Sequence, residues 1–176
     1  GDGQTTAMVV GAIKAYSRVD ETAVMRRAAA WLTKVRPATN QDLAFRLLGL
    51  AWANGPAGEI EKAARELAAA QRSDGGWGQL PEMRTDAFAT GQALYALHTA
   101  GKMGVNDPVY RKGTSYLLRT QEADGSWHVN TRSIWIQPYF ESGFPHGHDQ
   151  WISTAGTAWA AMALSLTVEP AKLSRR

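Results

Sequence analysis

Apolar residues recur every three to four positions along almost the whole chain, which is the period of an α-helix. Together with the flanking cap and turn residues, this period predicts seven helices. They cover residues 5–17, 21–35, 40–53, 57–71, 86–100, 108–121 and 153–167. Since no segment alternates apolar and polar residues as a half-buried strand does, the pattern predicts an all-α fold.

Residues that favour helix ends stand at the expected boundaries. The predicted starts are Thr5, Asp20, Thr39, Asp86, Asp107 with Pro108 after it, and Ser153. The predicted stops are Gly55, the Asp74–Gly76 turn, Gly101 and the Asp124–Gly125 turn. Small polar residues accept hydrogen bonds from the first free N–H groups of a helix, and glycine tolerates the positive φ that often ends one.

The predicted helices alternate between two kinds. Four are nearly uncharged, at 5–17, 40–53, 86–100 and 153–167, and the three between them carry a charged face. A helix that is apolar on most sides must be buried on most sides, whereas an amphipathic helix needs cover on one side only. The alternation therefore predicts an inner and an outer layer, built from about three and a half helical hairpins.

A repeat of about fifty residues runs through the outer helices. Lys62-Ala63, Leu67 and Gln71 recur as Lys112-Gly113, Leu117 and Gln121, each followed by an Asp-Gly turn and a tryptophan. The turn reverses the chain, so the indole returns over the end of the helix and the glutamine amide meets unpaired backbone groups there. We call this predicted structural unit the QW clamp. Its residues are Gln71, Gly75, Trp77, Gln121, Gly125 and Trp127.

The stretch KGTSYLLRTQEADGSW (112–127) resembles the QW motif of squalene–hopene and oxidosqualene cyclases in every slot. KAARELAAAQRSDGGW (62–77) departs only where Glu66 replaces an aromatic residue, and RAAAWL (27–32) is a degenerate third copy. The resemblance implies an α/α-toroid over residues 1–176 as a single domain, with 128–150 as an inserted loop. The start at GDGQTT and the small number of hairpins suggest a piece of a longer chain.

The catalytic motifs of the resembled families are missing. The chain has neither Asp-x-Asp-Asp nor Asp-Asp-x-x-Asp, and it lacks the cysteine of prenyltransferase zinc sites. We therefore expect a ligand-binding or interaction module with no recognisable catalytic acid. The alternative is an isoprenoid (triterpene) cyclase-type isomerase or lyase whose catalytic acid lies elsewhere in the chain. Asp86 is a weak candidate for that acid, although an Asp at a helix start more often caps the helix.

The segment 128–150 is far longer than an ordinary connection and is rich in aromatic and ionisable residues. Its candidate ligand-binding residues are Trp135, Tyr139, Phe140, Phe144 and His146. Glu141 and His148 are weak catalytic candidates, with Asp149 as an alternative partner for the histidine. The HGHD sequence could bring histidines and an acid to a metal, but it lacks the helical spacing of zinc signatures, so we expect no metal. The alternative is an ordered lid whose aromatic residues cover the helix ends.

Three aromatic residues, Trp52, Tyr95 and Trp159, fall on the predicted inner helices. They can line a pocket and stabilise a cationic ligand through their ring faces, but such residues more often form core, and we favour core. His98, near the end of an inner helix, is expected to be structural.

Composition indicates which classes of binding partner to expect. The net charge of +3 is scattered, which argues against nucleic acid, and the apolar runs are too short for a membrane span. We expect no cofactor, and an apolar small molecule, another domain or a second copy closing the ring as partner. The absence of cysteine is a weak indication of a secreted or periplasmic protein.

Overall fold

A computed structural model describes residues 2–18, 20–132 and 140–168, and within these ranges the only regular elements are helices. The α-helices are α1 (Asp2–Tyr16), α2 (Thr22–Leu32), α3 (Asn40–Trp52), α4 (Ala57–Ala69), α5 (Ala87–Thr99), α6 (Pro108–Thr120) and α7 (Gln150–Ser165). A short 3-10 helix, η1 (Gly147–Asp149), precedes α7. All seven predicted helices are present, and the prediction of an all-α fold is confirmed.

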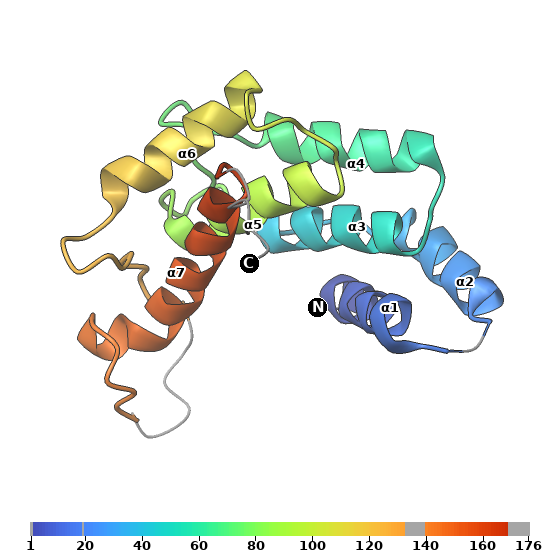
Figure 1. The fold of residues 1–176 in the computed structure, drawn as a ribbon, viewed down its shortest axis with the longest axis horizontal. Helices are drawn as coiled ribbons and strands as arrows, with labels where there is room; N and C mark the ends of the chain where they lie inside the picture. Colours follow the sequence, from blue (N-terminus) through green and yellow to red (C-terminus); the bar gives the residue numbers. More distant parts are fainter. Residues whose placement is uncertain (1, 19, 133–139, 169–176) are drawn as a thin grey trace, which may run out of the picture.

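The helices form the two predicted layers. The inner helices pack in the order α1, α3, α5 and α7, and each outer helix packs against the inner helices that flank it in sequence. Figure 1 shows α4 and α6 along one side of α3 and α5, with α1 on the opposite side of α3. The main core cluster lies around α3 and α5, where Leu47, Leu94 and Leu97 have no exposed surface. A smaller cluster contains Val10, Ala29 and Ala53. This is the architecture of part of an α/α-toroid.

Three predicted helix starts cap their helices. Thr39 accepts a hydrogen bond from the Asp42 N–H, and the Asp42 carboxylate closes a capping box on the Thr39 N–H. Asp86 accepts from the Ala89 N–H at the start of α5, and Asp107 accepts from the Val109 N–H at the start of α6. These side chains satisfy backbone donors that the first helical turn leaves unpaired.

The other three predicted starts are wrong. α1 begins at Asp2, ahead of Thr5, and α7 begins at Gln150, ahead of Ser153. Ser153 is instead buried, and its hydroxyl accepts a hydrogen bond from the Val129 N–H. Asp20 lies one residue too early, because Glu21 occupies the cap position of α2 while Asp20 accepts from the Thr22 N–H.

The helix ends use positive φ, but not always at the predicted glycine. Gly75 and Gly125 have φ values of +94° and +85° in the two Asp-Gly turns. At the ends of α3 and α5 the positive φ falls on Asn54 and Lys102, each next to the glycine that the sequence suggested. The Gly55 N–H donates to the Leu50 carbonyl, so this glycine closes the helix end by its backbone hydrogen bond.

Both QW clamps have the same geometry. The Trp77 indole N–H donates to the Leu67 carbonyl at 2.8 Å, and the Trp127 indole N–H donates to the Leu117 carbonyl at 2.9 Å. Both rings are buried. The two tryptophan backbone N–H groups donate to the next inner helix, at Thr90 of α5 and Thr157 of α7. Each clamp therefore joins the end of an outer helix to the inner helix that follows.

The two clamp glutamines differ. Gln71 and Gln121 both donate to a turn carbonyl, at Gly75 and Gly125 respectively. The Gln71 amide also donates to the Val109 carbonyl in the first turn of α6, at 2.7 Å. Gln121 is exposed, and no outer helix follows it among the described residues. Gln71 thus also links consecutive outer helices.

The aromatic slot of the repeat is filled in two ways. Tyr116 donates its hydroxyl to the Thr85 carbonyl just before α5. Glu66, at the equivalent position of α4, forms a salt bridge with Arg46 of α3, a residue that is only 8% exposed. Both side chains reach the preceding inner helix or its start, so the ion pair substitutes for the aromatic contact.

None of the described helices is both long and apolar enough to cross a lipid bilayer.

Candidate functional site

Two histidines stack where the Asp124–Gly125 turn meets the segment before α7. The His128 and His146 rings lie 4.8 Å apart at an interplanar angle of 11°. His128 Nε2 lies 2.7 Å from Asp149 Oδ2, and His146 Nε2 lies 2.7 Å from the Ser126 hydroxyl. We call these residues, together with Asp124, the histidine cluster. It ties the second QW turn to the segment that precedes α7.

The acids of the cluster favour their charged forms. Burial raises the pKa of Asp149, but hydrogen bonds from the His128 side chain and the Thr131 N–H outweigh it, so the pKa lies below its ordinary value. The Ser126 side chain and backbone N–H lower the pKa of Asp124. Both carboxylates are therefore acceptors at neutral pH and not proton donors.

The cluster contains aspartate, serine and histidine, but not in the order of a catalytic triad. The Ser126 hydroxyl donates to Asp124 Oδ1 at 2.6 Å, so its proton points to the acid and not to His146. Ser126 is also only 3% exposed. An activated serine needs a base that takes its proton and an exposed oxygen that reaches the substrate. The arrangement favours a structural role.

The other candidates of this segment are spread out. Trp135 and Tyr139 lie outside the described residues. Phe140 is 66% exposed, and its carbonyl accepts from the Trp151 indole N–H. Phe144 lies 6.3 Å from the His146 ring. Glu141 and His148 are both exposed, and the Glu141 carboxylate accepts from the Gly143 N–H.

Asp86 uses both carboxylate oxygens. Oδ1 caps α5, and Oδ2 forms a salt bridge with Arg132, whose guanidinium also lies over the Phe88 ring. A general acid must carry a proton and present it to the substrate. Because one oxygen of Asp86 accepts from a backbone N–H and the other pairs with Arg132, the carboxylate is engaged in contacts that hold the structure together.

An aromatic cluster joins three inner helices. The Trp159 ring of α7 makes edge contacts with Tyr95 of α5 at 5.6 Å and with Phe45 of α3 at 6.3 Å. Phe45 is buried, whereas Tyr95 and Trp159 are half-buried. Trp52, at the end of α3, packs close to Gly11 of α1. The inner layer therefore has a partly exposed aromatic surface near its centre.

A chain of side-chain amides crosses the inner helices α1, α3 and α5. The Gln41 amide donates to Gln4 of α1, and the Gln92 amide of α5 lies 3.5 Å from the Gln41 oxygen. Gln92 is 2% exposed, and its own side-chain oxygen has no hydrogen-bond partner.

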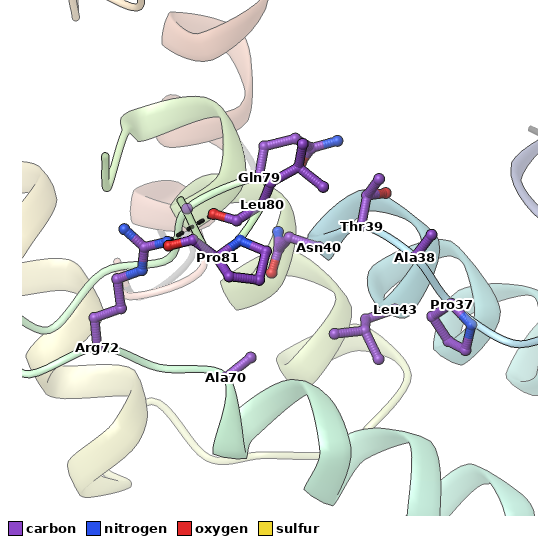
Figure 2. Close-up of a pocket in the computed structure, with 11 residues that line it drawn as sticks. Pro37, Ala38, Thr39, Asn40, Leu43, Ala70, Arg72, Gln79, Leu80 and Pro81 are labelled. Carbon is purple, nitrogen blue, oxygen red and sulfur yellow. Dashed lines mark hydrogen bonds between the residues drawn. The ribbon is translucent and has the colours of Figure 1, made fainter. Parts of the chain in front are cut away.

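A pocket of about 310 Å³ lies beside the start of α3. Figure 2 shows the residues that line it. Its walls come from the start of α3, the end of α4 and the 78–81 loop. Arg72 fixes that loop by donating to the Leu80, Pro81 and Met83 carbonyls. Larger hollows lie around α2: one of about 800 Å³ includes Met25 and Asn54, and one of about 550 Å³ includes Val9 and Trp31.

Within the described part of the chain, no three acidic or histidine side chains gather as metal ligands would.

Sequence reasoning missed Ser126, His128 and Arg132 because their partners His146, Asp149 and Asp86 lie 20 to 46 residues away in the chain. The only available signal was their proximity to the second QW turn. The buried Asn40 was missed because it follows a cap residue and looks like ordinary first-turn polarity.

Comparison with known proteins gives a consistent picture. The family model described as squalene-hopene cyclase C-terminal domain matches residues 46–148. Squalene--hopene cyclase of Bradyrhizobium diazoefficiens is 37% identical over 97 residues, which cover 49% of this chain and 13% of the relative. Lanosterol synthase ERG7 of Saccharomyces cerevisiae is 34% identical over 80 residues, which cover 46% of this chain and 10% of the relative. The chain thus spans only a small part of the curated relatives it matches.

Proposed function

We propose, from the premise that this chain belongs to the squalene-hopene cyclase C-terminal domain family, that it binds an apolar isoprenoid-type ligand on its inner-helix layer without supplying a catalytic acid. The two similar proteins are named squalene--hopene cyclase and lanosterol synthase, and these names motivate the ligand class. The proposal concerns binding by this chain.

The aromatic cluster of Phe45, Tyr95 and Trp159 is the observation that carries the proposal. Three successive inner helices supply its rings, and two of those rings keep exposed surface. Ring faces and edges offer large apolar contact area, and their faces also attract positive charge. A ligand that covers Tyr95 and Trp159 removes this apolar surface from water, which is favourable.

The state of Asp86 supports the non-catalytic part of the proposal. One of its carboxylate oxygens accepts from the α5 backbone and the other pairs with Arg132, so both are already engaged in contacts within the protein. The acids of the histidine cluster, Asp124 and Asp149, have lowered pKa values and are therefore poor proton donors.

Equilibrium binding of radiolabelled squalene from detergent micelles tests the binding function. We expect saturable binding that Trp159→Ala weakens by about tenfold, because truncating a contacting aromatic ring removes on the order of 1.4 kcal/mol or more. Trp31→Ala is the matched control, since Trp31 lies on the outer helix α2 and is 40% exposed. Equal binding by both variants, or no saturable binding by the folded wild type, contradicts the proposal.

A cyclase-type isomerase is the second candidate, favoured by the activities named for the two relatives. Incubation with squalene and analysis of the extracted products distinguishes it. We expect no cyclic product. A product that disappears in Asp86→Asn or Glu141→Gln, but persists in Asp124→Asn, would replace the binding proposal with a catalytic one.

A further inference from the structure

A second site that neither the family nor the aromatic cluster accounts for lies in the 310 Å³ pocket of Figure 2. We propose that this pocket binds a neutral molecule with an apolar body and one hydroxyl donor, of the phenol or alcohol class. The argument depends on Asn40, on the charge of the pocket and on its walls, and it is independent of the squalene-binding proposal.

Asn40 is the polar group at the base of the pocket. It is 4% exposed, and its side-chain amide donates to the Ala89 carbonyl of α5 at 3.0 Å. That bond fixes the orientation of the carboxamide, because a flipped group would bring two oxygens together. The Asn40 side-chain oxygen is then left buried with no hydrogen-bond partner.

A buried acceptor without a hydrogen-bond partner destabilises the folded protein. A ligand that donates a hydrogen bond to it removes this penalty, so the bond favours binding. Gln79, another lining residue, also has a buried side-chain oxygen without a partner. The pocket therefore lacks donors, not acceptors. Because the Asn40 oxygen has almost no exposed surface in the empty pocket, the ligand reaches it only when the wall yields slightly.

Charge decides which donor fits. Arg72 lines the pocket, and no aspartate or glutamate does. Within the described residues Arg72 bonds to backbone carbonyls and forms no ion pair with a carboxylate. The positive charge of Arg72 would repel an ammonium ligand, whereas it would not repel a neutral hydroxyl group.

The remaining walls are mostly apolar. They include Pro37, Leu43, Ala70, Leu80 and Pro81, which Figure 2 shows around one common space. A volume near 310 Å³ is at the lower end of the range for small-molecule sites. The walls and the volume suit a compact apolar body, with the Asn40 oxygen fixing the position of its hydroxyl.

The structure is held in place around this space. A Cβ atom on Gly78 would lie 2.4 Å from the Arg72 guanidinium, so the loop and the arginine are packed against each other. The Asn40 N–H donates to the Gln79 carbonyl, which joins the start of α3 to the same loop. Contacts between three segments therefore hold the walls of the pocket together.

The test uses 2-naphthol as the probe and 2-methoxynaphthalene as its control, because O-methylation removes the hydrogen-bond donor and otherwise adds only one methyl group. We expect saturation-transfer NMR titrations to give 2-naphthol roughly a 2- to 10-fold lower Kd, the size of one net hydrogen bond. Equal affinities, or no saturable binding of either probe, overturn the proposal and leave water as the occupant of the pocket.

Two substitutions of alanine by leucine test whether the probe binds in this pocket. Ala70 lines the pocket and is exposed, so Ala70→Leu fills the space without disturbing the core. Ala69→Leu, one residue earlier on the same exposed helix end, does not line it. We expect 2-naphthol binding to be lost in Ala70→Leu and kept in Ala69→Leu. The same affinity in both variants contradicts the site.

Asn40→Leu tests the acceptor itself. If the variant folds by circular dichroism, the preference for 2-naphthol over 2-methoxynaphthalene should disappear, and a preserved preference contradicts the role of Asn40. If it does not fold, the comparison of the two probes and the two leucine variants, Ala70→Leu and Ala69→Leu, still tests the proposal.

Discussion

At the residue scale, most of the hydrogen-bonding side chains that fix this structure bond to backbone carbonyls and N–H groups of neighbouring segments. Trp127 is typical: its indole N–H reaches the Leu117 carbonyl, its ring is 3% exposed, and its backbone N–H reaches Thr157. One residue therefore joins α6, the following turn and α7.

Trp127→Ala should lower the free energy of unfolding by about 3–5 kcal/mol, the usual cost of truncating a buried large aromatic residue. Trp127→Phe keeps most of the apolar volume and loses the indole hydrogen bond, so it should cost clearly less. Urea denaturation followed by circular dichroism measures both. If squalene binding by the folded Trp127→Ala protein is also lost while its stability is unchanged, the tryptophan belongs to a site and not to a clamp.

Tyr110 shows how burial makes stability depend on pH. Its hydroxyl donates to the Ala163 carbonyl at 2.8 Å, and burial raises its pKa from 10.0 to about 12. Because the folded-state pKa is the higher one, the stabilisation is complete below pH 10 and is lost as the pH rises towards 12.

Melting curves of the wild type and Tyr110→Phe test this sign. The wild type should have the higher Tm below pH 10, since it keeps the hydrogen bond to Ala163, and the difference should shrink between pH 10 and pH 12. Comparing the two proteins at each pH cancels the titration of groups they share. A difference that stays constant or grows over this interval contradicts the assignment.

At the scale of helices, the sequence was most informative where a physical requirement is local. The 3.6-residue period located all seven helices, and Thr39, Asp86 and Asp107 cap as their positions suggest. It was least informative where tertiary contacts override local preference. Ser153 looks like a cap but lies inside α7, because its hydroxyl satisfies the buried Val129 backbone.

The candidate site was predictable only in part. The QW clamps follow from a turn and a repeat, which are sequence-local. His128 pairs with Asp149, and Arg132 pairs with Asp86. These pairs are far apart in the sequence, so the sequence alone does not show which residues meet. The buried acceptor of Asn40 likewise exists only because Ala89 of α5 lies beside it.

The packing of α7 on α5 gives a test at this scale. A Cβ atom on Gly91 would lie 2.5 Å from the backbone carbonyl carbon of Trp159, so Gly91→Ala must push the two helices apart. We expect a loss of about 1–3 kcal/mol in the free energy of unfolding, the usual cost of overpacking. The shift should also disturb the ring contacts of Trp159, visible in near-ultraviolet circular dichroism.

Gly58→Ala is the matched control. Gly58 lies in α4, and a Cβ atom there meets no other atom within 4 Å. Alanine should therefore stabilise the protein by roughly 0.5–1 kcal/mol through its better helix propensity. If Gly91→Ala were also stabilising, helix propensity alone would explain both results, and that outcome would contradict close packing at Gly91.

At the scale of the whole molecule, the structure is a two-layered array of helical hairpins in which each hairpin contacts mainly its neighbours. In such arrays, stability is roughly a sum of local terms, and terminal units lack one neighbour. α5 lies between α3 and α7 and has nine buried residues, whereas α1 has Ala7 and Val10 buried and leaves Met8 and Val9 about half exposed.

This difference predicts a gradient of local stability. Amide hydrogen exchange should be slowest in α3 and α5, whose backbone hydrogen bonds break only when the core opens, and fastest in α1 and α2. Mass spectrometry of peptides from the folded protein at neutral pH measures it. A partner or second copy that covers the α1–α2 edge should selectively slow exchange there, because it supplies the missing neighbour. Equal protection of α1 and α5 in the dilute protein would contradict this gradient and mean that all the hairpins open as one cooperative unit. Such coupling would have to extend beyond neighbouring inner helices. The contact between Trp159 of α7 and Phe45 of α3 is one contact of this kind.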